Sequence, residues 1–295
     1  MDWLLEPFDP EFMRRALAAG MLAVLASSTV GTWVVLRGLT FLGDALAHGV
    51  VPGMALAALW GFDVTIGALV TAALMVGGIT LVSRRARLHE DTGVGLLFVG
   101  MLALGVVIVS KSRSFATDVQ TLLFGDVLGV TDGDLRLQVV AAVIVVALSV
   151  IGYRAFLALS FNEVKAASLG LHPSITHLAL LALVALAIVS SFRAVGTLLV
   201  FGLLVGPPAT AALLVRRVWL NMVVAVLLGW AAVVVGLVLS YWHGTAAGAT
   251  MAGVSVAGFF LVLLGQELAA LVRGRAPSPA LAEEPPHPHS AHEHR

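Results

Sequence analysis

The sequence predicts an all-α, polytopic membrane protein. Of its 295 residues, 59% are hydrophobic and only 12% are charged, and the mean hydropathy is +1.01. Soluble domains carry about 25% charged and about 45–50% apolar residues, so a water-soluble globule is excluded. Continuous apolar runs such as 139–150 lack the alternation of membrane β-strands, which leaves helices as the spanning elements.

Each membrane-spanning helix needs about 20 mainly apolar residues. Nine stretches meet this requirement: 16–36, 40–61, 63–83, 92–111, 136–157, 174–191, 195–215, 218–241 and 246–272. The stretch 40–61 contains Pro52, and 195–215 contains Pro207 and Pro208, so either could be short, broken or re-entrant. We therefore expect eight to nine spans in the cell membrane. With nine spans, the excess of Lys and Arg in alternate loops places the C-terminus inside the cell.

We expect one transmembrane permease domain over residues 1–275 and a tail over 276–295. The tail holds five of the eleven prolines and four of the nine histidines, so it cannot bury a core and should be disordered and cytoplasmic. Within the membrane domain, the inner loop 160–171 is polar enough to form a short amphipathic helix. The outer loop 111–134 is the other long connection.

The sequence lacks the residues that several classes of function require. The net charge is zero, so nothing favours binding to nucleic acid. The absence of Cys excludes disulfides, thiolate metal sites and Cys nucleophiles. There is no Walker A motif, no HExxH and no GxSxG, so we expect a protein that is not an enzyme and does not hydrolyse ATP by itself.

Asp44 and His48 are the clearest candidates for a functional site. They are four residues apart in a predicted span, so they share one helix face, and ionisable groups at membrane depth are functional hypotheses by default. A carboxylate and an imidazole at this spacing can bind one divalent cation; the alternative is a hydrogen-bonded pair that only stabilises a helix contact. Zinc prefers four ligands, and a two-fold dimer would supply two Asp and two His.

Other histidines are weaker candidates. His243 lies at the outer end of a span, whereas His172 and His177, on either side of Pro173, are expected at the membrane interface. The four tail histidines are His287, His289, His292 and His294. Imidazole suits zinc and manganese favours carboxylates and water, so the tail favours zinc unless it is only a solvated low-complexity segment.

The stretch from Arg37 to Gly53 resembles the signature of metal-ion ABC importer permeases, in which an Arg precedes Gly-Asp-Ala-x-x-His and a Pro-Gly follows. The resemblance continues through the motifs at 90–95, 122–128, 195–200, 206–211 and 247–249. It implies a homodimeric permease of two-fold symmetry, with a substrate path at the protomer interface. In that family the signature Asp and His line the metal path, which here are Asp44 and His48.

The segment from Phe161 to Gly170 resembles the coupling helix through which such permeases dock onto their ATPase. The resemblance implies roles in that contact for Phe161, Asn162, Glu163, Ala167 and Gly170, with Asn162 standing where the family usually has Asp. It also implies two partners, cytoplasmic ABC ATPase subunits and an extracytoplasmic metal-binding protein.

We therefore expect the membrane subunit of an ATP-driven importer of divalent metal ions, with zinc as transported ion and no permanently bound cofactor. Manganese or iron(II) import by the same architecture is the alternative, as is import of a vitamin or iron chelate. A secondary, ATP-independent metal transporter is a further alternative. It is disfavoured because Glu267 is the only carboxylate between Glu163 and the tail.

Overall fold

The computed structural model describes residues 6–85, 90–110, 129–161 and 170–272. Every regular element in these ranges is helical, which confirms the all-α prediction. The elements are η1 (Glu6–Phe8), α2 (Glu11–Leu36), α3 (Thr40–Gly49), α4 (Val51–Trp60), α5 (Val64–Arg85), α6 (Glu90–Val109), α8 (Asp132–Ile151), α9 (Tyr153–Phe161), α11 (Pro173–Val195), α12 (Thr197–Leu214), α13 (Val218–His243) and α14 (Ala247–Val272).

Within the described residues, eight helical stretches are long and apolar enough to cross a membrane, with α3 and α4 counted together as Thr40–Trp60. The remaining predicted span corresponds to α12, whose apolar part, Val200–Leu214, is shorter. The chain is therefore a multi-pass membrane protein, and the expected eight to nine spans are confirmed.

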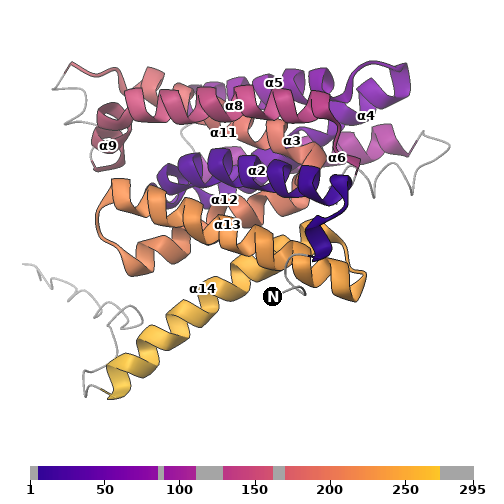
Figure 1. Ribbon diagram of the computed structural model, residues 1–295. Coiled ribbons are helices and arrows are strands. Elements are labelled where there is room, and N and C mark those ends of the chain that lie inside the picture. Colours follow the sequence, from indigo (N-terminus) through magenta and orange to yellow (C-terminus); the bar gives the residue numbers. More distant parts are fainter. Residues whose placement is uncertain (1–5, 86–89, 111–128, 162–169, 273–295) are drawn as a thin grey trace, which may run out of the picture.

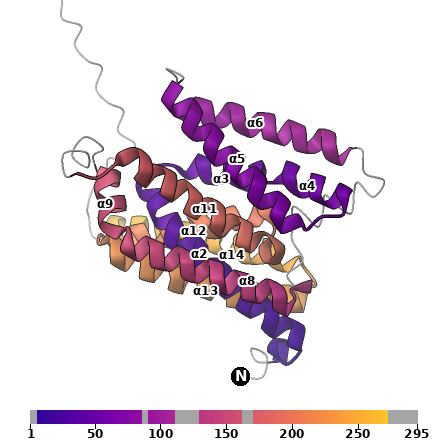
Figure 2. The same cartoon turned by 90° about the horizontal axis from the view of Figure 1, so that it is seen from above.

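Helix α2 forms the centre of the bundle and packs against α8, α11, α12 and α13 (Figure 1). Its buried face includes Ala16, Ala19 and Ala23, small residues that allow helices to approach closely. Helices α6 and α14 lie at the periphery (Figures 1 and 2), and large apolar side chains such as Leu96 and Leu261 are exposed on them. These exposed faces suit contact with lipid.

The span 40–61 is broken, as its proline suggested. Pro52 has no N–H, so it cannot donate to the His48 carbonyl four residues earlier. The Val50 N–H donates to that carbonyl instead, and α4 begins at Val51. The chain around His48 therefore lies at a helix end inside the bundle rather than in a continuous helix.

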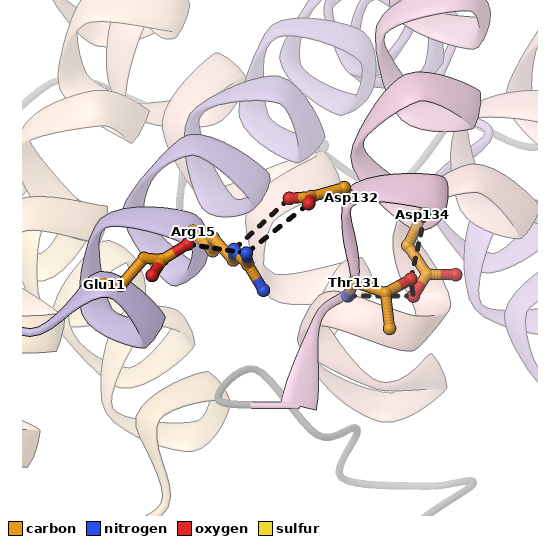
Figure 3. Close-up of polar contacts among 5 residues, drawn as sticks. All are labelled: Glu11, Arg15, Thr131, Asp132 and Asp134. Atoms are coloured by element: carbon orange, nitrogen blue, oxygen red, sulfur yellow. Dashed lines mark hydrogen bonds and ion pairs between the residues drawn. The ribbon is translucent and has the colours of Figure 1, made fainter.

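The span predicted at 136–157 was wrong at both ends, because the chain forms α8 from Asp132 and a separate α9 after Gly152. Asp132 and Asp134 suggested a loop, but they belong to the first turn of α8 (Figure 3). Thr131 Oγ1 accepts from the Asp134 N–H at 3.3 Å, and Asp134 Oδ2 accepts from the Thr131 N–H at 3.1 Å. This capping box satisfies amide groups that would otherwise lack partners.

An ion pair joins this end of α8 to the start of α2 (Figure 3). The Arg15 guanidinium lies 2.6 Å from Glu11 Oε1 in its own helix and 3.2 Å from Asp132 Oδ1. Arg15 thus contacts both helices at the ends of α2 and α8 that lie farthest from α9.

Candidate metal site

Asp44 and His48 lie one turn apart on α3, as predicted, with His48 Nε2 3.6 Å from Asp44 Oδ1. This separation is too long for a hydrogen bond. The side chains are largely but not completely buried, with 14% of His48 and 32% of Asp44 exposed. The carboxylate and the imidazole therefore face each other without a hydrogen bond between them.

The other ring nitrogen of His48 is also unsatisfied. Its Nδ1 is buried and has no hydrogen-bond partner among the described residues. Phe98 on α6 packs edge-on against the imidazole with 5.5 Å between ring centres, and Phe41 packs against Phe98 at 5.9 Å. The imidazole is thus partly shielded from solvent, which makes an unpaired polar atom costly.

Helix α3 is held on another side by α12. Gly43, directly before Asp44, faces Leu204: a Cβ added at Gly43 would lie 2.6 Å from Leu204 Cδ2. Phe98 and Leu204 could not be identified from the sequence, because each is an ordinary apolar residue far from residue 44 in the chain. Together α6 and α12 set the position of the Asp44–His48 face.

The Asp44–His48 separation is compatible with a shared metal ion. Two ligands about 2.1 Å from one zinc ion at a tetrahedral angle lie about 3.4 Å apart. The described part of the chain contains no group of three or more His, Asp or Glu side chains that could hold a metal. Among the described residues, Asp44 and His48 thus offer two potential ligands, and any further ligand would have to be water, another chain or a residue outside the described ranges.

The other predicted ligands do not join this pair in the described part of the chain. His243 is exposed at the end of α13, and its Nδ1 lies 3.0 Å from the Leu239 carbonyl oxygen. The four tail histidines lie outside the described residues.

The predicted ATPase contact is described only at its edges. Phe161 is the last residue of α9, with 79% of it exposed, and Gly170 has φ +76°, the left-handed conformation often found after a helix end. Asn162, Glu163 and Ala167 lie outside the described residues. Tyr153 and Phe156 anchor α9 on Trp33 of α2, with ring centres 5.4 and 5.6 Å apart.

Comparisons with known proteins agree with this architecture. The model of the ABC 3 transport family matches residues 9–266. The manganese transport system membrane protein MntC of Listeria monocytogenes is 34% identical over 86% of this chain and 90% of its own length. The chelated iron transport system membrane protein YfeC of Yersinia pestis is 33% identical over 84% of each chain.

A solved structure is similar over the same region. The structure of PsaBC from Streptococcus pneumoniae in complex with Fab matches 89% of this chain and 94% of its own, with a TM-score of 0.79 and 29% identity. The length of the match, the helical architecture and the motifs from Arg37 onward all indicate the same family. The chain therefore belongs to the ABC 3 transport family, the metal-importer permeases that its motifs resemble, and is a membrane subunit whose ATPase is a separate protein.

Proposed function

We propose that this permease imports a divalent transition-metal ion and that Asp44 and His48 bind the ion transiently on its way through the membrane. The observation that carries the proposal is the 3.6 Å separation between Asp44 Oδ1 and His48 Nε2. This separation is longer than a hydrogen bond and close to the spacing of two ligands around one tetrahedral metal ion.

A transport site must bind its ion well enough to admit it and weakly enough to release it. The two potential ligands found among the described residues suit this requirement, because a complete set of four would hold zinc firmly. In a homodimer, the equivalent pair of the second protomer or water would complete the coordination. The carboxylate would replace part of the hydration shell, and the imidazole would add a nitrogen ligand common to first-row metals.

The energy for transport would come from partner proteins. An extracytoplasmic metal-binding protein would deliver the ion, and ATPase subunits would bind the surface between Phe161 and Gly170. ATP binding would favour one of two global states of the permease, and the difference in binding free energy between these states drives the change.

Manganese or iron is the first candidate for the transported ion, because the relatives MntC and YfeC are named for manganese and iron transport. The sequence-based choice of zinc depends on the tail histidines. Zinc therefore remains a second candidate, supported by four imidazoles within the residues 287–294.

The test is uptake into proteoliposomes that contain the permease with its ATPase and binding protein. We expect ATP-dependent accumulation of manganese(II) or iron(II), with zinc(II) as the competing ion in a parallel series. Accumulation without the ATPase, driven by a proton gradient, would contradict the proposal and favour a secondary transporter. ATP-dependent uptake of an iron chelate but of no free ion would favour a different cargo.

A further inference from the structure

The helix that carries Asp44 and His48 is joined to the end of α2 by a short connection. Only residues 37–39 separate α2 from α3. Gly38 has φ +67°, and the Leu39 N–H donates to the Val34 carbonyl at 2.9 Å, which closes the end of α2. A displacement of the end of α2 therefore moves the start of α3, and Asp44 lies about 6 Å along the helix from Thr40 at 1.5 Å per residue.

The two chain segments that flank the predicted ATPase contact both meet this end of α2. On the N-terminal side, α9 packs Tyr153 and Phe156 onto Trp33. On the C-terminal side, α11 brings His177 to Arg37, whose Nη1 lies 2.8 Å from His177 Nδ1. The end of α2 thus contacts the helix before and the helix after the segment between Phe161 and Gly170.

The chemistry of the two side chains defines which of them donates the Arg37–His177 hydrogen bond. A guanidinium only donates hydrogen bonds, so Nδ1 of His177 is the acceptor. The contact is partly buried and involves a charged donor, and such bonds are stronger than those between neutral groups. The carbonyl end of α2 also favours a cation at residue 37.

We propose that the Arg37–His177 hydrogen bond is a coupling link that, beside the direct packing of α11 against α2 and α3, carries movement of α11 to α3 and the Asp44–His48 pair. Arg37 and His177 are positioning residues, since neither touches the ion. The inference rests on the proposed function, in which the segment between Phe161 and Gly170 binds the ATPase. Without the link, ATP hydrolysis continues but repositions the metal ligands less efficiently.

The experiment measures manganese(II) transported per ATP hydrolysed by the full complex in proteoliposomes. His177→Leu removes the acceptor, Arg37→Gln removes the charged donor, and His177→Asn retains an acceptor near the position of Nδ1. The control is His172→Leu, the same substitution at the exposed N-cap of α11, whose side chain makes no capping hydrogen bond. Chromatographic profile and yield of each complex report folding.

We expect His177→Leu and Arg37→Gln to lower the number of ions transported per ATP by about tenfold. Loss of a hydrogen bond to a charged group shifts the equilibrium between coupled and uncoupled arrangements of α11 and α2 by about this factor. ATP hydrolysis and ATPase binding should remain, His177→Asn should restore most of the ratio, and His172→Leu should match the parent. If both link variants keep the parental ratio, the inference is wrong. If the ratio falls only in parallel with folded yield, the contact is merely structural and the inference is also wrong.

Asp44→Asn in the same assay separates this inference from the proposed function. If that variant transports manganese(II) at the parental rate, the assignment of the metal pair is wrong. A loss of transport in Asp44→Asn combined with unchanged coupling in the link variants would overturn the link alone.

Discussion

Gly31 on α2 lies against the backbone carbonyl oxygen of Leu204 on α12, so closely that a Cβ atom at residue 31 would collide with this oxygen. Pro208 explains why the carbonyl is available, since proline has no N–H to donate to the residue four positions earlier. Asn221 on α13 completes the contact region: its Oδ1 accepts from Thr32 at 3.3 Å. Helices α2, α12 and α13 thus meet where Pro208 interrupts the backbone hydrogen bonding of α12.

Replacing Gly31 by Ala should therefore destabilise the protein by about 1–3 kcal/mol, the usual cost of excess volume in a packed core. The measurement is thermal unfolding of the purified permease in detergent. Gly100→Ala on α6 is the matched control, because a Cβ there has no neighbour within 4 Å. That substitution should be neutral or stabilise by up to about 1 kcal/mol. Equal stability of the two variants would contradict the close approach of α2 and α12.

Replacing Phe161 by Asp should release the ATPase or reduce its binding. The side chain is exposed at the end of α9, and an exposed aromatic residue often fills a pocket of a partner protein. The measurement is co-purification of the ATPase with the permease. Phe62→Asp is the control, since Phe62 is similarly exposed at the turn before α5 and is not predicted to contact the ATPase. Normal co-purification with the Phe161 variant would exclude this residue from the contact.

The polar contacts at the start of α8 should contribute unequally to stability. Thr131→Ala removes the cap of α8 and should cost about 1 kcal/mol. The Arg15–Asp132 pair is exposed, so a double-mutant cycle should give a coupling energy below about 1 kcal/mol that decreases further as salt is added. Thermal unfolding of the single and double variants measures both the cost of losing the cap and the coupling energy of the ion pair. A coupling energy that exceeds the cost of losing the cap would contradict this ranking.

Deleting residues 285–295 should leave metal uptake possible, because the proposed ligands lie in the membrane, but should change its dependence on zinc concentration. The four imidazoles of this segment favour zinc binding. Calorimetry on a peptide of this sequence near neutral pH gives the direct measurement. Absence of zinc binding at micromolar concentrations would remove the argument for zinc as transported ion.

Much of the fold could be predicted from the sequence, because apolar length alone identifies the spans and Pro52 indicates the broken one. The start of α8 was missed because Asp132 and Asp134 suggest a loop unless their role in capping is recognised. Asp44 and His48 could be paired because their spacing is local to one helix. In contrast, the contacts of His48 with Phe98 and of Arg37 with His177 depend on tertiary packing between distant segments. No local pattern in a single sequence encodes these contacts.

The central claim is that Asp44 and His48 bind the transported ion, and ATP-dependent manganese(II) uptake by Asp44→Asn and His48→Ala complexes in proteoliposomes tests it most directly. Glu267→Gln, at an exposed carboxylate of α14, is the control. Because removing even an indirect partner of a metal ligand typically costs about 10–100-fold, each variant should lose at least about tenfold in uptake. Folding and ATPase binding should remain intact, and the control should match the parent. Parental uptake by both variants would show that the pair is structural and would contradict the account.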